Sequence, residues 1–388
     1  MKEGWEYKKL GDICTIVGRI GFRGYTKADL VRSSKDGAIT LSPSNIIDGE
    51  LNYSKCTYIN WDKYYESPEI MLDNGDVVLV KTASIGKCAV VKNLPHEATL
   101  NPQFVVLKQL IGVPDFICYY LKSSIAQNTI KQMAGGVAIP TLSQKKLSMM
   151  IIPAPHLTEQ QSIVDYLDSA FAKIDAIKAN AEKALNEAKA LFQASLKEML
   201  EPKEGWEEKT LKEICTVING RAYSKDEMLK QGKYRLLRVG NFFTNDSWYY
   251  SDLELDEDKY CDNGDLLYAW SASFGPRIWD GEKVIYHYHI WKMVCSAEIN
   301  KYFLCYWLDS DELKKQTMIN LHGATMAHIT KGIIEAANVG FPSVSEQQKI
   351  VDTLDSIKAK VDRLQENCNK ISQECDALKQ AILKQVFS

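Results

Sequence analysis

The chain has 388 residues, of which 45% are hydrophobic, but no stretch of it approaches 18 uninterrupted apolar residues. A membrane-spanning helix is therefore not predicted. The first ten residues, Met1–Leu10, are charged, which argues against a signal peptide. We expect a cytoplasmic protein with no membrane partner, and its length is sufficient for two domains with separate cores.

Several catalytic and metal-binding patterns are also missing. No G-x-x-x-x-G-K-[ST] loop is present, so ATP hydrolysis is not predicted. The ten cysteines show no C-x-x-C spacing, and we interpret them as buried, reduced thiols. The histidines show no metal-ligand spacing beyond the alternation of His287 and His289, which we expect on one face of a strand. No nucleophile, base and orienting residue can be assembled, so the sequence predicts neither a catalytic residue nor a metal site.

One short segment resembles a catalytic signature. Asn101-Pro102-Gln103-Phe104 is similar to the Asn-Pro-Pro-Phe motif of amino-methyltransferases, in which the Asn and the aromatic residue hold the target base. Gln103 replaces the second proline, however, and no glycine-rich nucleotide loop follows an earlier strand. We therefore predict a turn at the entry to a strand, and no cofactor site in this chain.

The chain also lacks a strong excess of positive charge. Its net charge is −3, which divides into +4 for residues 1–157, −3 for 158–202, −4 for 203–344 and zero for 345–388. No segment has the basic character of a stand-alone DNA-binding domain. A DNA partner would require charge gathered on one face, or phosphate contacts supplied by other subunits.

The most informative feature that is present is a long internal repeat. Three short segments return 201, 189 and 187 residues later, respectively: Glu3–Glu6 at Glu204–Glu207, Asp73–Asp76 at Asp262–Asp265, and Glu159–Gln161 at Glu346–Gln348. This period is too long for a solenoid repeat. It indicates a duplicated unit that consists of a domain followed by a helix.

Each half begins with a mixed region of short strands between Gly, Asn, Asp and Pro residues. The predicted strands are Ala38–Leu41, Val77–Lys81, Cys88–Val91, Phe104–Leu107, Tyr234–Val239, Leu266–Trp270, Val284–His289 and Trp291–Cys295. Helical spacing predicts one helix over Asp115–Gln132 and another over Lys301–Ile319. Each region closes with a glycine loop (Gly135-Gly136 in the first half, Gly323 in the second) and a proline.

Each half ends with a segment of more than 40 residues that contains almost nothing to stop a helix. Thr158 with Gln161, and Ser345 with Gln348, have the spacing of capping boxes. Apolar residues then alternate in steps of three and four, which predicts a heptad seam. The residues expected to pair the two helices are Ile163, Leu167, Ile174, Ile177, Leu191, Ile350, Leu354, Ile357, Val361, Leu364, Ile371, Leu378 and Ile382. Two units related by a pseudo-twofold axis would bring these helices together antiparallel.

Repeated loops supply the candidate ligand contacts. Asn-Gly-Asp and a strand lead in both halves to a small, hydroxyl-rich loop that ends in a basic residue, and basic residues also lie near glycines early in each half. Such groups can contact phosphates and base edges. The candidate DNA-binding residues are Arg19, Arg23, Ser44, Asn45, Lys81, Ser84, Lys87, Arg221, Arg235, Arg238, Asn241, Ser273 and Arg277. For each of these residues alone, a solvated surface position or a plain turn is the competing interpretation.

The arrangement resembles the specificity subunits of type I restriction–modification systems. The similarity rests on Gly-Trp…Leu near the start of each half, Asn-Gly-Asp with its strand, Gly135-Gly136…Ile139, and Pro…Glu-Gln-Gln…Ile-Val…Leu before each long helix. In the second half, His322-Gly323 replaces the glycine pair, Lys212 replaces Gly11, and the stretch before Asn-Gly-Asp is 12 residues shorter.

The resemblance implies an α+β protein with two mixed α/β target recognition domains, 1–157 and 203–344, separated by spacer helices 158–202 and 345–388 that form an antiparallel coiled coil. It implies a non-catalytic subunit that binds a bipartite double-stranded DNA site and two methyltransferase subunits. S-adenosylmethionine would be bound by those subunits, and ATP and Mg²⁺ by restriction subunits if present. The alternative is a non-catalytic coiled-coil scaffold that binds protein partners through duplicated domains.

Overall fold

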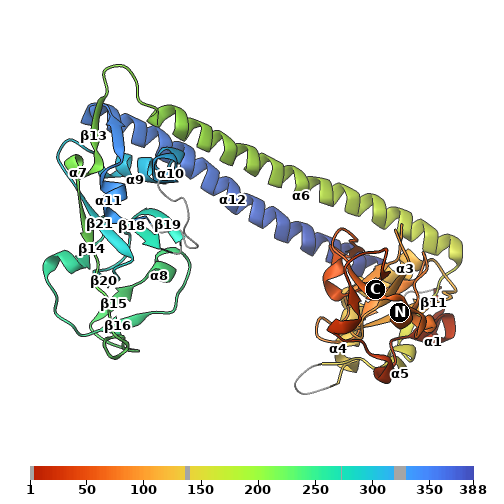
Figure 1. Ribbon diagram of the computed structural model, residues 1–388. Helices are drawn as coiled ribbons and strands as arrows, with labels where there is room; N and C mark the ends of the chain where they lie inside the picture. Colours follow the sequence, from red (N-terminus) through yellow and green to blue (C-terminus); the bar gives the residue numbers. More distant parts are fainter. Residues whose placement is uncertain (1–3, 136–139, 272, 319–328) are drawn as a thin grey trace. The chain divides into compact units, whose positions relative to one another are not determined.

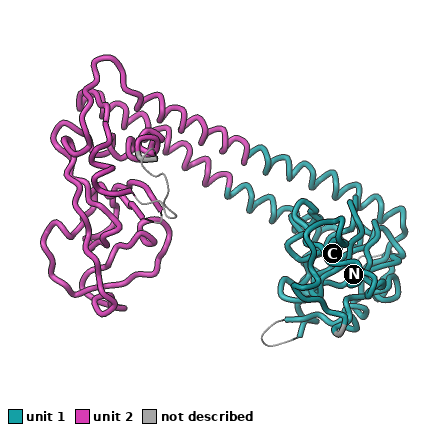
Figure 2. Tube along the Cα trace, in the orientation of Figure 1, with its two compact units in different colours: residues 1–181, 369–388 teal, residues 182–368 magenta. Residues whose placement is uncertain are grey.

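The computed structural model describes residues 4–135, 140–271, 273–318 and 329–388. The chain divides into two compact units (Figure 2): unit 1 comprises Met1–Ala181 and Asn369–Ser388, and unit 2 comprises Glu182–Cys368. Two helices of 44 residues each, α6 (Leu157–Leu200) and α12 (Val344–Phe387), contribute to both units (Figure 1). No described helix contains an apolar stretch long enough to cross a membrane.

The β-rich part of unit 1 is built on two four-stranded sheets. Their orders are β2-β11-β8-β9 and β10-β4-β7-β3, and two strand pairs, β1-β12 and β5-β6, flank them. The strands are β1 Tyr7–Lys9, β2 Thr15–Val17, β3 Leu30–Val31, β4 Gly37–Leu41, β5 Ile46–Ile47, β6 Glu50–Leu51, β7 Thr57–Asn60, β8 Val77–Val80, β9 Cys88–Val90, β10 Ala98–Leu100, β11 Phe104–Lys108 and β12 Ile151–Pro153. The helices are α1 Leu10–Ile13, α2 Trp61–Tyr65, α3 Pro114–Lys122, α4 Ser124–Met133 and α5 Gln144–Ser148.

Unit 2 repeats the first of these sheets as β14-β21-β18-β19, and its second sheet has the order β16-β15-β20-β17. The strands are β13 Glu207–Thr210, β14 Cys215–Asn219, β15 Tyr234–Leu237, β16 Tyr249–Ser251, β17 Tyr260–Cys261, β18 Leu266–Ser271, β19 Ser273–Ile278, β20 Val284–Tyr286, β21 Ile290–Cys295 and β22 Asn338–Phe341. The helices are α7 Leu211–Ile214, α8 Val239–Phe243, α9 Lys301–Asp309, α10 Asp311–Met318 and α11 Lys331–Glu335.

The two units differ in their second sheet. Both have a central strand with one parallel and one antiparallel neighbour: β4 between β10 and β7, and β15 between β20 and β16. The fourth strand lies beside β7 in unit 1 and beside β20 in unit 2. It is therefore added at opposite edges of the three-strand arrangement that the units share. The two units therefore differ in where the additional edge strand of this sheet lies.

The predicted strands are confirmed within one or two residues, with one exception: Val284–His289 ends as a strand at Tyr286. The helical character predicted for the two segments is confirmed, but each segment forms two helices rather than one. Ser123 separates α3 from α4 and its hydroxyl accepts a hydrogen bond from the N–H of Ala126, while buried Ser310 separates α9 from α10. A serine that caps a new helix stops the preceding one even where the apolar spacing continues.

The predicted capping boxes are also wrong. Thr158 lies inside α6, and Gln161 donates to Asp165 one turn later rather than to a cap. In α12 the capping hydroxyl is that of Ser343, which accepts from the N–H of Glu346 at 3.4 Å. α6 begins at Leu157 and α12 at Val344, each one residue before the predicted spacer segment.

Residues near both ends of each long helix form part of the hydrophobic core of a unit. Val164 and Leu167 near the start of α6, with Leu383 and Phe387 near the end of α12, belong to the main core cluster of unit 1. In unit 2, the same positions of the repeat, Leu196 and Leu200 with Val351 and Leu354, belong to the main core cluster. Every one of these side chains is less than 5% exposed. Each helix therefore stabilises one unit with its first turns and the other with its last.

The two helices run antiparallel where they meet within each unit. In unit 1, Lys379 Nζ lies 2.5 Å from Asp175 and Lys178 Nζ lies 3.5 Å from Asp376. In unit 2, Lys189 donates to Gln365 at 2.6 Å, which continues the same register. The predicted antiparallel pairing of the helices is confirmed.

A heptad seam consists of two rows of residues, each with a spacing of seven. The predicted positions are confirmed for one of these rows. Leu167, Ile174 and Leu354 are buried, as that row requires, and Cys368 and Cys375, which continue the row at steps of seven residues, are buried as well. The second row lies one residue later than predicted, at Phe171, Lys178, Leu185 and Phe192 of α6 and at Gln365, Ser372 and Lys379 of α12. Ile177, Leu191, Leu364 and Leu378, which the sequence assigned to the seam, are exposed. The apolar pattern fits a step of three followed by four as well as a step of four followed by three. The observed second row was not recognised in the sequence because it contains the charged residues Lys178 and Lys379.

All ten cysteines are free thiols, and six of them are buried. The expectation of reduced, mostly buried thiols is therefore confirmed. Residues Gly136, Ile139, Ile319, His322 and Gly323, which were used in the sequence predictions, lie outside the described residues.

Candidate nucleic-acid interface

Three loops of unit 1 meet at one end of the sheet β2-β11-β8-β9. They follow β2 (Arg19), precede β11 (Asn101–Gln103) and follow β8 (Lys81–Lys87). Arg19 Nε donates to the carbonyl oxygen of Leu100 at 3.1 Å. The N–H of Lys81 donates to the carbonyl oxygen of Gln103 at 2.7 Å. Hydrogen bonds to backbone carbonyl groups thus hold both basic loops against the segment that precedes β11.

The Asn101–Phe104 segment forms the turn at the centre of this cluster. The side-chain oxygen of Asn101 accepts from the N–H of Gln103 at 2.9 Å, and the Asn101 carbonyl accepts from the N–H of Phe104 at 3.2 Å. Phe104 is fully buried in the core. The predicted strand-entry turn is confirmed, and the aromatic ring is not available to hold a base.

Unit 2 brings the corresponding three loops together at the same end of its matching sheet. The N–H of Arg221 donates to the Tyr286 carbonyl at 3.1 Å, and the N–H of Tyr288 donates to the Arg221 carbonyl at 3.0 Å. The N–H of Trp270 donates to the His289 carbonyl at 3.1 Å. The backbone arrangement is therefore repeated, although the side chains it presents are different.

His287 and His289 lie in the turn between β20 and β21 and not on a strand, so the predicted placement is wrong. Their ring centroids are 4.8 Å apart. Burial, together with the nearby His289 and Arg238, lowers the pKa of His287 to about 4. His287 is therefore neutral near pH 7. Among the residues that the structure describes, no group of three metal-ligating side chains is present.

Most of the candidate DNA-binding residues have partners within the protein. Arg221 forms a two-point ion pair with Glu227 (3.1 and 2.7 Å). The other residues engaged in this way, with the groups they contact, are Arg19 (Leu100 and Thr99), Arg23 (Glu69), Ser44 (Ser42), Asn45 (Asn52 and Lys55), Arg235 (Glu282), Asn241 (Asn245 and Ser247) and Arg277 (Asp280 and Phe242). Arg19 and Asn45 are buried, which makes them positioning groups for the loops.

The remaining candidate residues have side-chain donors that no carboxylate of the described residues pairs with. Lys87, Ser84 and Ser273 are exposed at the hairpin loops, and half-buried Lys81 has its pKa lowered by desolvation. Exposed Arg238 stacks over the ring of Tyr249 at 5.2 Å. These are the side chains that the arrangement leaves available for phosphate or base contacts.

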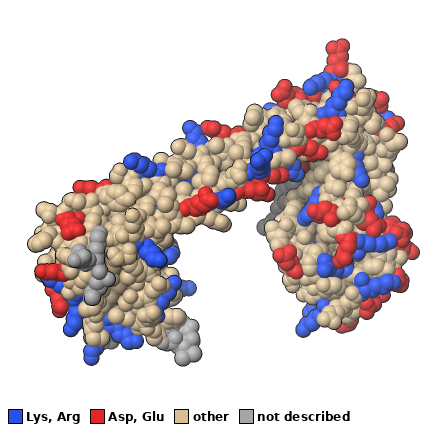
Figure 3. All heavy atoms as spheres, turned by 180° about the vertical axis from the view of Figure 1, so that it is seen from behind, with Lys and Arg blue, Asp and Glu red and all other residues tan. Residues whose placement is uncertain are grey.

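The surface charge follows the same division between the units. On the face shown in Figure 3, Lys and Arg side chains gather along the lower edge of unit 1 (at left), whereas unit 2 mixes both signs. This agrees with a net charge of +4 for residues 1–157 and −4 for residues 203–344.

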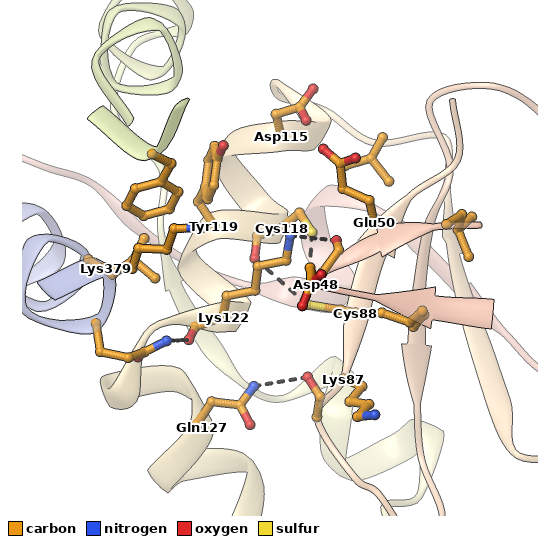
Figure 4. A pocket seen from close by; sticks show the side chains of 18 of the residues that line it. Asp48, Glu50, Lys87, Cys88, Asp115, Cys118, Tyr119, Lys122, Gln127 and Lys379 are labelled. Atoms are coloured by element: carbon orange, nitrogen blue, oxygen red, sulfur yellow. Dashed lines mark hydrogen bonds between the residues drawn. The ribbon is translucent and has the colours of Figure 1, made fainter. Parts of the chain in front are cut away.

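A separate feature of unit 1 is an open groove of about 1310 Å³ (Figure 4). Two of its lysines are engaged within the protein: Lys122 Nζ donates to the Gly49 carbonyl at 2.8 Å, and Lys379 pairs with Asp175. Carboxylates of Asp48, Glu50 and Asp168 also line it. The groove is therefore poorly suited to a phosphate backbone. Beneath it the buried Cys88 and Cys118 sulfur atoms lie 3.9 Å apart.

Unit 2 also contains a group of aromatic side chains that was not among the predicted site residues. Tyr223, Trp270, Phe274 and Tyr288 lie beside the basic loops of this unit. The available signal was the contrast between the repeats, since Trp270 replaces Lys81 and Tyr288 stands near the position of Pro102. Only the tertiary structure shows that these aromatic residues converge.

The comparisons with known proteins agree with this architecture. The family described as type I restriction modification DNA specificity domain matches residues 2–187 and 203–373. The chain is 25% identical to the type I restriction enzyme EcoKI specificity subunit of Escherichia coli K12, covering 100% of this chain and 89% of that protein. It is 24% identical to the MjaVIII specificity subunit of Methanocaldococcus jannaschii, covering 98% and 91%.

Two solved structures share the fold over nearly their full length. A chain from a type I R-M system structure superposes with a TM-score of 0.77 at 19% identity, covering 100% of this chain and 98% of that one. The HsdS subunit of Thermoanaerobacter tengcongensis gives 0.58 at 18% identity, covering 100% and 97%. With two matched specificity domains and two long antiparallel helices, the chain belongs to the family of type I restriction–modification specificity subunits.

Proposed function

We propose that this chain recognises a split double-stranded DNA site, with the loop cluster of each unit reading one half-site. The observation that carries the proposal is the repeated meeting of three loops at the same end of the same sheet. The backbone arrangement is kept in both units, whereas several of the side chains differ, such as Lys81 against Trp270 and Ile85 against Phe274. Two loop clusters with the same backbone arrangement and different exposed side chains would recognise two different half-site sequences.

We further propose that the chain performs no chemistry itself and serves two methyltransferase subunits, with restriction subunits as possible further partners. S-adenosylmethionine, and ATP with Mg²⁺ where restriction subunits take part, would be bound by those partners. The weak net charge supports this division, because partner subunits can share the neutralisation of phosphates.

The long helices supply the surface for such partners. Tyr166, Ile177, Leu191, Leu364 and Leu378 are large apolar side chains on α6 and α12 that are exposed in this chain. Exposed apolar residues in a row mark protein interaction surfaces more often than solvated ones. The same observation favours the second candidate function, a scaffold that binds only proteins.

An electrophoretic shift assay with the co-expressed modification subunits separates the two candidates. We expect sequence-selective binding to a duplex that carries a split site, identified first by sequencing of methylated adenines. Assembly of the subunits without selective DNA binding or methylation would favour the scaffold.

A further inference from the structure

We propose that unit 2 inserts an aromatic surface, formed by Phe274 and Tyr288 and backed by Trp270, into a base step of its DNA half-site. This inference rests on the proposed function and adds a mode of recognition to it. The ligand would be a duplex that is locally unstacked at one step, and unit 1 would bind its own half-site without such an insertion.

A stack of aromatic rings leads from the core of unit 2 to this surface. Tyr268 and Trp291 are buried and stack with centroids 6.0 Å apart at 17°. Trp291 stacks on half-buried Trp270 at 5.6 Å and 19°. Trp270 in turn lies 6.1 Å from the ring of Tyr288 and donates from Nε1 to the Tyr288 carbonyl at 2.8 Å. The outermost rings therefore rest on a fixed support, which lowers the entropic cost of binding.

Phe274 extends this support at the β18–β19 hairpin. It is the cross-strand partner of Trp270, so the two side chains share one face of the antiparallel pair. Phe274 and Tyr288 are each 38% exposed. Gly275 follows with φ of 145°. Two exposed aromatic side chains at adjacent loops are a costly surface unless a ligand covers them.

Two arginines lie close to the aromatic surface. The guanidinium of Arg221 stacks over Tyr223 at 5.0 Å, and Tyr223 stacks on His287 at 6.4 Å, but Arg221 is ion-paired with Glu227. Exposed Arg238 is close enough to depress the pKa of His287, and no carboxylate among the described residues pairs with it. An aromatic surface beside Arg238 favours nucleic acid over an apolar protein surface, because this cation can hold a phosphate while the rings contact bases.

The corresponding loops of unit 1 offer no such rings. Residues 81–87 read Lys-Thr-Ala-Ser-Ile-Gly-Lys, and residues 101–103 read Asn-Pro-Gln. The loop 81–87 is also held inward, since Gln127 Nε2 donates to the Gly86 carbonyl at 2.9 Å. The two units therefore differ in the kind of contact they can make as well as in sequence.

The test uses the complete complex with its modification subunits and duplexes that carry 2-aminopurine at single positions of the unit 2 half-site. For the unaltered chain we expect a rise in fluorescence at one position, which reports unstacking. Phe274→Ala and Tyr288→Ala should remove that rise and weaken binding about tenfold to a hundredfold, from the usual contribution of base–aromatic stacking. Phe274→Trp and Tyr288→Phe should retain both properties and show that folding is not the cause.

Tyr302→Ala is the matched control, because Tyr302 is 42% exposed in the same unit at the start of α9. It should leave fluorescence and affinity unchanged. Alanine variants that bind and unstack like the unaltered complex would overturn the proposal, as would variants that fail to assemble with the modification subunits, since the surface would then be a protein contact. If the unaltered complex selects no split site at all, the proposed function itself fails, which is a separate result.

Discussion

The side-chain oxygen of Gln160 accepts a hydrogen bond from the backbone N–H of Val113 at 2.9 Å, while its Nε2 donates to the Pro155 carbonyl at 2.8 Å. The repeat reproduces this arrangement: Gln347 accepts from the N–H of Asn300 at 2.7 Å and donates to the Pro342 carbonyl at 2.8 Å. Both glutamines are less than 5% exposed. In each half of the repeat, one buried glutamine side chain thus links the first turn of the long helix to the domain that precedes it in the sequence.

Gln160→Leu is expected to destabilise the chain by about 2–3 kcal/mol, because two buried backbone groups lose their hydrogen-bond partner. Chemical denaturation measures this change. The neighbouring Gln161→Leu is the control and should change stability by less than about 0.5 kcal/mol, since Gln161 is exposed and bonds only Asp165. Equal losses for both variants would contradict the assigned role of Gln160.

The observed seam of α6 can be tested with two leucines six residues apart. Leu185 is 6% exposed and Leu191 is 65% exposed. Leu185→Ala should cost about 2–4 kcal/mol, as expected for a buried leucine, whereas Leu191→Ala should cost less than about 0.5 kcal/mol. If thermal unfolding of the isolated chain showed the opposite order, the sequence-based seam would be the correct one.

Leu191→Ala has a second expected effect under the proposed function. Because Leu191 belongs to the exposed apolar row on the helices, its loss should weaken assembly with the modification subunits while leaving the chain itself stable. Co-purification at several salt concentrations measures this. Unchanged assembly would remove Leu191 from the docking surface.

The half-length fragment Met1–Pro202 is expected to self-associate. In the full chain Leu383 and Phe387 complete the core of unit 1, and the ring of Phe387 lies 5.4 Å from that of Phe116. The fragment lacks these residues, but Leu196 and Leu200 of a second copy occupy the same positions of the repeat. Sedimentation should show a dimer that Leu196→Ser with Leu200→Ser disrupts. A folded monomer would contradict this expectation.

The helices are expected to act as a ruler between half-sites. Adding one heptad to both helices lengthens the pair by about 10 Å at 1.5 Å per residue, which corresponds to about three base pairs. Methylome sequencing should then show a larger gap between half-sites. A heptad added to α6 alone should change the gap or abolish assembly, because it moves one seam against the other. An active enzyme with an unchanged gap would refute the idea.

Stability should fall in mildly acidic solution through His287. Its folded-state pKa of about 4 lies below the ordinary value of 6.5, because burial and the nearby His289 and Arg238 disfavour the charged form. Protonation therefore favours the unfolded chain, and the stability from neutral His287 is lost as pH falls from about 6.5 towards 4. Melting temperatures of His287→Gln should depend less on pH in this window than those of the unaltered chain. His156→Gln, at an exposed histidine, is the control.

The sequence by itself determined the architecture. Repeated segments and strand patterns identified the duplicated domains and long helices, because periodicity and turn residues are local properties. The helix starts and seam phase were less secure. In α12 the capping hydroxyl belongs to Ser343 rather than to the predicted Ser345. An alternation of three and four residues also fits two different seams, and only the packing of the partner helix distinguishes them.

The tertiary structure alone decided which side chains the candidate site presents. Arg19, Arg221 and Arg277 looked available in the sequence, yet each is held by a partner elsewhere in the chain. Trp270, Phe274 and Tyr288 converge only because hairpin β18–β19 and the turn before β21 meet at one end of the sheet. Ion pairing and ring stacking depend on contacts between distant segments, and a single sequence does not specify those contacts.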